Sequence, residues 1–234
     1  MDSEKTPKAQ ITRQRILDAA LPLFLERGFE KVTMRAIASK AELSLGAAYY
    51  YFRTKEHIVH EFYSQTLEKH FQATRQILDR SDDFRWRLQR VLELQIEVAR
   101  PFHLVSRALF RIAADPTNSL SPFSHESQPI REASIGLFGK ALAGSNQKIP
   151  KPLAAHLPTL LWLFDLAVIL FWIFDRSPEQ KRTFRFIAKS TGLAVQLLNV
   201  ARLPLFGKVW EPVFSLLGEF SIFKTSQGQV NGQS

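Results

Sequence analysis

The sequence predicts an all-α fold with an N-terminal three-helix domain that contains a helix-turn-helix, followed by a larger C-terminal helical domain. Apolar residues recur at helical spacing in successive segments, and prolines and polar clusters separate these segments. No alternating, strand-like pattern is sustained, and there is no internal repeat. With 234 residues, 45% of them hydrophobic and 23% charged, the chain can bury a core of globular size.

The two ends of the chain are polar. Residues 1–10 lack the apolar core of a signal peptide, so we expect a short disordered arm there. A helical domain is expected over residues 11–56. Its connecting helix, over residues 54–80, leads into a C-terminal helical domain over residues 57–224. The polar tail, residues 225–234, is expected to be disordered.

The segment from Thr33 to Lys55 reads as two short helices joined by a tight turn and followed by a third. A hydroxyl residue stands where it can cap each helix: Thr33, Ser44 and Thr54. The two short helices are expected over residues 34–40 and 45–52. This arrangement matches the helix-turn-helix, whose second helix enters the major groove of double-stranded DNA. The sequence therefore indicates a DNA-binding module.

The helix before this segment ends in a glycine and an aromatic residue, and its pattern is carried by Arg13, Ile16, Leu17, Ala19, Ala20, Leu23, Phe24, Arg27, Gly28 and Phe29. In residues 33–56, the reading unit, the pattern is carried by Thr33, Ile37, Ala38, Gly46, Tyr49, Tyr51, Phe52, Lys55 and Glu56. These two patterns resemble the tetracycline repressor (TetR) family of bacterial transcription regulators. The resemblance implies a homodimer, usually a repressor, with a C-terminal effector-binding domain. It also implies that these residues touch DNA: Thr33, Arg35, Leu45, Gly46, Tyr49, Tyr50 and Lys55.

The second helix of this reading unit has no ionised side chain. Gly46 and Ala47 let its backbone approach base edges, and Arg35 is the candidate for a guanine or a flanking phosphate. Tyrosine hydroxyls, Lys55 and the helix-start amides suit phosphates. The predicted DNA-binding set is Thr33, Arg35, Ser44, Leu45, Gly46, Ala47, Tyr49, Tyr50, Thr54 and Lys55. In an alternative interpretation, Tyr49 packs with Phe52 under the first helix.

Further helices are expected over residues 84–99, 102–114, 130–143, 153–175, 177–201 and 213–220. The segment 153–175 is apolar enough to suggest a membrane span, but Pro158 and Asp165 interrupt it. We therefore expect a buried helix and no membrane partner. A capping box at residues 177–180 is predicted to open the next helix. The apolar surfaces of these two helices suit a four-helix bundle across a two-fold axis, and such a homodimer selects a palindromic operator.

Two groups of residues are candidates for a pocket that binds a small-molecule effector. The first group is a polar stripe with a neighbouring aromatic residue: His103, Arg107, Phe110 and Arg111. The second shares one helical face: Trp162, Asp165, Ile169 and Trp172. His and Arg suit an anionic amphiphile, whereas Asp165 among aromatic residues suits a cation. Alternatively, Asp165 pairs with Arg107 or Arg111, and the tryptophans belong to the core or the dimer interface.

Enzymatic and metal sites are not indicated. The chain has no cysteine, no nucleophile elbow, no phosphate-binding glycine loop and no Glu-x-x-His pair. His57, His60 and Glu61 fall within one helical turn, but further metal ligands are not evident, so we expect neither a metal nor a cofactor. A chain without cysteine also suits a reducing cytoplasm.

The net charge of +9 is consistent with a nucleic-acid partner. Seven Lys and Arg against two Asp and Glu fall in residues 181–234, where a solvated helix face or anionic lipid explains them equally well. The alternative to an effector-controlled repressor is a ligand-independent or architectural DNA-binding protein. Solid packing of residues 101–175 would favour that alternative.

Overall fold

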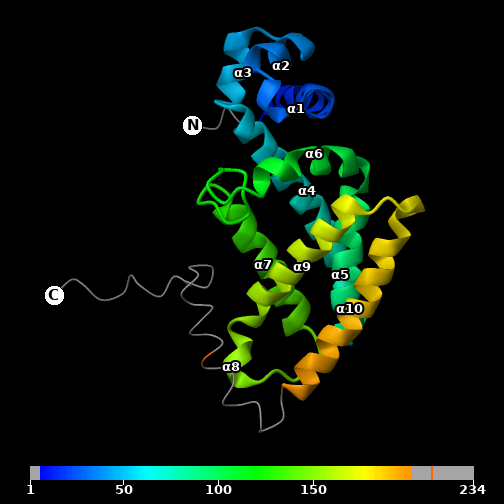
Figure 1. Cartoon of the computed structure of the whole chain (residues 1–234). Helices are drawn as coiled ribbons and strands as arrows, with labels where there is room; N and C mark the ends of the chain where they lie inside the picture. The colour runs from blue at the N-terminus through cyan, green and yellow to red at the C-terminus, as the bar shows by residue number, and fades with distance from the viewer. Residues whose placement is uncertain (1–5, 202–211, 213–234) are drawn as a thin grey trace, which may run out of the picture. The chain divides into compact units, whose positions relative to one another are not determined.

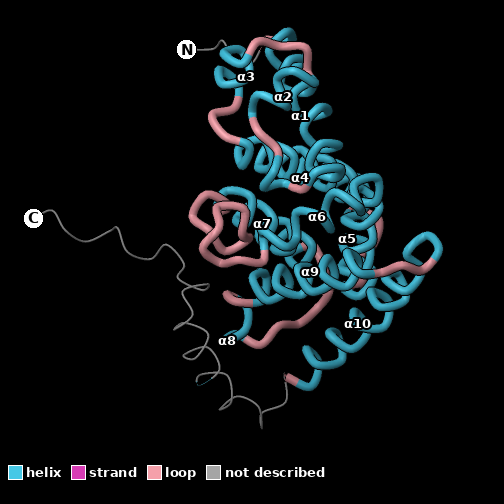
Figure 2. The backbone as a smooth tube through the Cα atoms, turned by 45° about the horizontal axis from the view of Figure 1, so that its top comes forward, coloured by secondary structure: helices cyan, strands magenta, loops and turns pink. Residues whose placement is uncertain are grey.

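The computed structural model describes residues 6–201 and 212, and every regular element in this part is a helix (Figures 1 and 2). The α-helices are α1 (Pro7–Arg27), α2 (Met34–Lys40), α3 (Leu45–Tyr51), α4 (Lys55–Leu78), α5 (Phe84–Ala99), α6 (His103–Ala113), α7 (Gln128–Ala143), α8 (Lys151–Ala154), α9 (Leu157–Phe174) and α10 (Lys181–Val200). The short 3₁₀ helices are η2 (Phe29–Lys31), η3 (Arg100–Phe102) and η4 (Pro178–Gln180). The all-α prediction is confirmed, whereas the helix and the tail predicted at 213–220 and 225–234 lie outside the described residues.

The helices form two compact units. Among the described residues, one unit contains 6–72 together with 95–132, and the other contains 73–94 together with 133–201. Three helices, α4, α5 and α7, continue from one unit into the other. The division differs from the predicted domain boundary after residue 56, because α6 and the loop after it belong to the same unit as the helix-turn-helix.

A hydrophobic core shared by α1 and α6 explains why α6 belongs to the same unit as the helix-turn-helix. Ile16 and Phe24 of α1 are fully buried, and Val105 and Leu109 of α6 belong to the same cluster. Phe52, just after α3, is also buried there. Burying each such side chain stabilises the fold by about 2 kcal/mol, so α6 is a structural part of this unit.

Helix α1 starts earlier than expected. The Thr6 hydroxyl accepts a hydrogen bond from the Ala9 amide at 3.3 Å, and Pro7 occupies the first turn. The predicted arm over residues 1–10 is therefore wrong for residues 7–10. The helix ends at Gly28, whose φ of 80° is readily adopted by glycine.

In the second unit, Asp175 joins α9 to α10. Its Oδ2 accepts hydrogen bonds from the amide and the hydroxyl of Thr183 at 2.9 and 2.7 Å, and its Oδ1 accepts one from the Ser177 amide at 2.8 Å. The predicted capping box is wrong, because Glu179 and Gln180 have φ angles of 55° and 53° and α10 begins after them. The first turn of α10 is capped by two side chains: the Asp175 carboxylate accepts from the Thr183 amide, and the Ser177 hydroxyl accepts from the Arg182 amide at 3.1 Å.

Helix α9 is the one described helix long and apolar enough to cross a membrane by length and composition. One face is buried, whereas Leu170, Phe171 and Phe174 are exposed. The single predicted segment 153–175 is divided at Ala155 and His156 into α8 and α9. Helix α9 therefore packs one face inside its unit and leaves an apolar face open.

Candidate nucleic-acid interface

Side-chain caps begin the helices of the reading unit. In chain order, the amides of Ala36, Ala47 and His57 donate to the hydroxyls of Thr33, Ser44 and Thr54, at 3.2, 3.1 and 3.3 Å. The three predicted caps are confirmed. Each cap contributes about 1 kcal/mol to helix stability, so the sequence itself determines where α2, α3 and α4 begin.

Backbone hydrogen bonds close the turn between α2 and α3. The Leu43 amide donates to the Ala38 carbonyl at 2.9 Å and the Glu42 amide to the Ser39 carbonyl at 3.1 Å, as in a Schellman motif. Glu42 has a φ of 52°, which is strained for a residue other than glycine. Its carboxylate accepts a hydrogen bond from Arg15 at 2.6 Å, which ties the turn to α1.

Helix α3 divides its side chains between the core and the surface. Ala48 and Phe52 are buried, whereas Tyr49 and Tyr50 are 47% and 64% exposed. The alternative that Tyr49 packs in the core is therefore wrong. Tyr51 instead packs against the core cluster. The helix is thus anchored by one face and presents two tyrosines on the other.

The remaining predicted DNA-binding residues lie around this exposed face. Those that are exposed are Thr33, Arg35, Ser44, Gly46 and Thr54, and those that are half-buried are Leu45 and Ala47. A Cβ atom at residue 46 would meet no protein atom within 4 Å, so the fold does not require glycine there. Arg53, just after α3, is also exposed. It was not predicted, although a basic residue directly after the second helix is a usable sequence signal.

Lys55 has an internal role that the sequence did not indicate. Its ammonium donates to the carbonyl oxygens of Phe29 and Glu30 at 2.9 and 3.3 Å. It also lies 4.3 Å from the centre of the Phe29 ring. These contacts join the start of α4 to η2, so Lys55 supports the reading unit from within.

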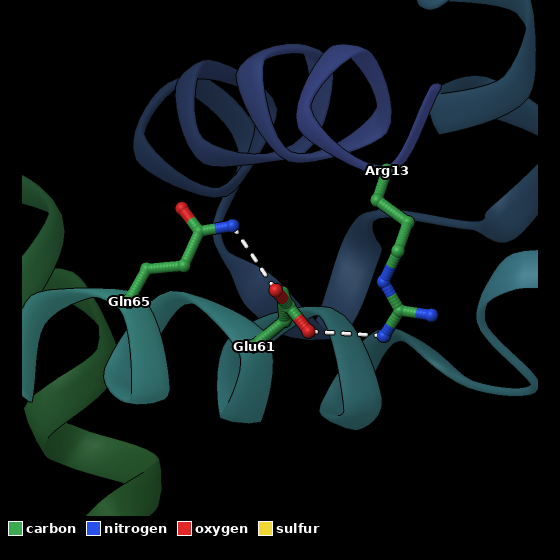
Figure 3. A network of polar contacts seen from close by, with 3 residues as sticks. All are labelled: Arg13, Glu61 and Gln65. Atoms are coloured by element: carbon green, nitrogen blue, oxygen red, sulfur yellow. Dashed lines mark hydrogen bonds and ion pairs between the residues drawn. The ribbon is translucent and has the colours of Figure 1, made fainter. Parts of the chain in front are cut away.

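An ion pair fastens α4 to α1 (Figure 3). Arg13 Nη2 lies 2.9 Å from Glu61 Oε2, and Gln65 donates to the other oxygen of Glu61 at 3.0 Å. The Arg13 guanidinium also lies 4.8 Å from the centre of the Phe52 ring. Glu61, considered above as a metal ligand, is thus a positioning residue. The sequence has no local signal for this pair, because its members are 48 residues apart.

The histidines beside Glu61 differ in their surroundings. His57 is exposed, whereas both ring nitrogens of His60 are buried. Burial, followed by the neighbouring His57, lowers the pKa of His60 and favours its neutral form. Within the described residues no group of three or more His, Cys, Asp or Glu side chains is arranged to hold a metal ion.

The eight residues predicted to line an effector pocket belong to different compact units. Those on α6, in the first unit, are His103, Arg107 and Phe110, which are half-buried, and Arg111, which is exposed. Those on α9, in the second unit, are Trp162, Asp165 and Trp172, which are buried, and Ile169, which is half-buried.

Asp165 is the unusual member of these eight. It is 6% exposed, and its Oδ1 has no hydrogen-bond partner within the described residues. Burial raises its pKa to about 7. Arg107 and Arg111 belong to the first unit and Asp165 to the second, so their pairing stays a prediction.

Two family models match the chain. Residues 16–62 match the model described as "Bacterial regulatory proteins, tetR family". Residues 87–211, more than half of the chain, match the model described as "Tetracyclin repressor-like, C-terminal domain". The chain belongs to the TetR family of transcriptional regulators. The resemblance seen in the first fifty-odd residues thus extends through the C-terminal helices of this TetR-family protein.

Curated relatives match a part of the chain. The HTH-type transcriptional regulator UidR of Escherichia coli is 39% identical over 69 residues, which are 30% of this chain and 35% of UidR. The repressor KstR of Rhodococcus jostii is 47% identical over 47 residues, which are 20% of this chain and 22% of KstR. These matches therefore span about a third or less of the relatives' own lengths.

Solved structures share the fold over most of the chain. A putative TetR-family regulator from Syntrophomonas wolfei has a TM-score of 0.65 at 16% identity, over 83% of this chain and 98% of that chain. FadR from Thermus thermophilus, a TetR-family repressor solved with lauroyl-CoA, has a TM-score of 0.56 at 19% identity, over 79% of this chain and 93% of that chain. At these identities the likeness is one of fold.

Proposed function

We propose that this TetR-family protein is a cytoplasmic homodimeric repressor. It binds a palindromic operator in double-stranded DNA and is released by a small apolar or amphiphilic effector. The observation that carries the proposal is the division of α3, which anchors Ala48 and Phe52 in the core and exposes Gly46, Tyr49 and Tyr50. A helix held in this way can enter the major groove without rearranging the unit. The protein acts as a regulator rather than an enzyme.

The exposed chemistry of α3 suits contact by shape and apolar groups. Leu45 and Ala47 offer methyl groups to thymine, and the hydroxyls of Tyr49 and Tyr50 reach phosphates. Arg35 on α2 is an exposed basic side chain that can contact a guanine or a phosphate. With so few polar groups on α3, sequence-dependent DNA shape contributes to operator choice.

Gly46→Ala separates DNA contact from folding. The new methyl group meets no protein atom within 4 Å, so we expect a stability gain of up to about 1 kcal/mol from the loss of glycine in a helix. The same methyl group stands between α3 and the bases, so operator affinity should fall at least about tenfold, or about 1.4 kcal/mol. Thermal unfolding and fluorescence anisotropy measure the two effects.

Gly136→Ala is the matched control. Gly136 lies in α7, and a Cβ there also meets nothing within 4 Å. This variant should gain stability without losing affinity for DNA. Equal operator affinity for Gly46→Ala and wild type would remove α3 from the interface.

Exposed apolar residues on α9 and α10 support a homodimer. They are Leu170, Phe171, Phe174, Leu193, Leu197 and Val200. Helices that leave such residues open in one chain can bury them against a second copy, as in a four-helix bundle. Leu197→Asp should therefore shift the protein from dimer to monomer in light scattering. Leu104→Asp, at an equally exposed leucine on α6, should leave the dimer intact.

Effector control requires the two compact units to communicate. The continuous helix α4 carries the reading unit at its start and enters the second unit at residue 73. An effector in the second unit that favours one orientation of α4 changes the separation of the two helix-turn-helix units in the homodimer. A coupling of about 1 to 3 kcal/mol gives a useful response.

A further inference from the structure

We propose that the second unit binds a hydrophobic amine, and that the Asp165 carboxylate is the anion that receives its ammonium group. The inference rests on the proposed function, since it names the chemical class of the effector. Asp165 lies in the middle of α9, on the face that this helix buries. Trp162 and Ile169 are one turn away on the same face, so aromatic and aliphatic groups flank the carboxyl.

The isolation of this carboxyl is the first argument. Asp165 is 6% exposed, and Oδ1 has no hydrogen-bond partner within the described residues. None of the ion pairs in this part of the chain includes it. Buried carboxylates in folded proteins are normally paired or hydrogen-bonded, because an unpaired buried charge costs several kcal/mol or more. The described residues therefore leave this oxygen available to a bound partner.

Two hydroxyl groups in the same unit share this condition. Thr74 on α4 and Thr191 on α10 are fully buried, and the Oγ1 atoms of both have no hydrogen-bond partner in the described structure. Three helices of one unit thus each bury a polar atom that the described chain does not satisfy. A unit whose sole purpose is packing would carry apolar residues at these positions, as it does at Val168 and Ile187.

The chemistry of the carboxyl selects the ligand. An ammonium group with at least one N–H supplies both the opposite charge and the hydrogen-bond donor that Oδ1 lacks. An anion is repelled, and a neutral alcohol supplies the donor without the charge. Because the carboxyl is buried, a ligand bound to it is also removed from water. The rest of the ligand must therefore be apolar. Aromatic neighbours such as Trp162 also favour a cation.

The test uses matched ligands that differ only at the head group. The probes are 4-phenylbutylamine, 4-phenylbutanol and 4-phenylbutyrate, together with the straight-chain amines, alcohols and carboxylates of increasing length. Calorimetric titration of the full-length protein at about pH 8 should show the preferred amine binding at least about tenfold more tightly than its alcohol, and the carboxylate more weakly still. Asp165→Asn, of almost the same shape, should abolish the difference between amine and alcohol.

Asp79→Asn makes the same substitution at an exposed position of the same unit and should leave the preference for amines unchanged. An amine preference that survives Asp165→Asn overturns the proposal, as does a series in which no amine binds better than its alcohol. Operator affinity measured with the bound amine tests the proposed function separately. Binding through Asp165 without release of DNA would sink effector control but keep the cation site. Release of DNA by a carboxylate and by no amine would support effector control but overturn the cation site.

Discussion

Gly144 leaves the space that the guanidinium of Arg87 occupies: a Cβ atom at residue 144 would lie 2.4 Å from Arg87 Nη2. Arg87 is 5% exposed and donates to the backbone carbonyls of Leu78 at the end of α4, of Ser81 after it, and of residues 140 and 141 near the end of α7. One buried cation thus donates to carbonyl groups near the ends of two helices, where intrahelical donors run out.

Gly144→Ala should therefore destabilise the protein by about 2 to 4 kcal/mol, because the methyl group displaces a buried charge from its acceptors. Chemical denaturation measures the loss. In an Arg87→Met background the same alanine should cost much less, since no guanidinium remains to be displaced. Equal costs in the two backgrounds would show that the two residues are not coupled.

Asp175 makes the stability of the second unit sensitive to acid. Burial alone would raise its pKa, but the hydrogen bonds from Ser177 and Thr183 outweigh burial and lower the pKa below its ordinary value. A lowered carboxyl pKa contributes stability above the unfolded pKa, and this contribution is lost as the pH falls through the folded pKa. Asp175→Asn should be less stable near pH 7 and lose less on acidification below about pH 4. Urea unfolding near pH 7 and below about pH 4 checks this. The control variant Asp79→Asn should show the same stability as wild type at both.

Asp165 should act in the opposite direction. Burial raises its pKa to about 7, so the folded state keeps a proton that the unfolded chain releases near pH 4. Its contribution should make wild type progressively less stable as the pH rises from about 4 to about 7, and then level off. Asp165→Asn should remove this contribution and be more stable than wild type at pH 8. If the free energy of unfolding fell equally between about pH 4 and about pH 7 in wild type and Asp165→Asn, Asp165 would not ionise in this range.

Lys55 distinguishes support of the fold from contact with phosphate. Its ammonium is held by two carbonyl oxygens and the Phe29 ring, so Lys55→Met should lower stability by about 1 to 3 kcal/mol. The salt dependence of DNA binding by the folded variant should match wild type. A salt slope reduced by about one unit would instead restore the phosphate contact that the sequence suggested.

The parts of this structure that the sequence predicts are those with local signals. The hydroxyls of Thr33, Ser44 and Thr54 each cap the helix that follows by accepting a hydrogen bond from the amide three residues later. The spacing of apolar residues likewise locates α5 and α7 within a few residues. Features that depend on distant contacts escaped prediction. The sequence carries no mark that Arg87 binds residues more than fifty positions away, or that α6 packs on α1.

The tyrosine run of α3 shows the same limit on a smaller scale. Three adjacent tyrosines offer no periodic signal, so the sequence left Tyr49 between the core and the surface. The turn after α2 sets the rotation of α3, exposing Tyr49 and Tyr50 and packing Tyr51 against the core. Likewise, Ser177 and Gln180 fit a capping box by spacing, but the backbone at Gln180 is left-handed and α10 begins after it. Its first turn is capped by Asp175 together with Ser177.

The central claim is that two copies of α3 read a symmetric site in DNA. Selection of bound fragments from random-sequence DNA by the purified protein, followed by sequencing, tests it most directly. The account predicts a palindromic consensus whose half-sites are one helical turn apart, or a multiple of it, and whose enrichment weakens for Gly46→Ala but not for Gly136→Ala. Fragments bound without any consensus, and equally by both variants, would contradict it.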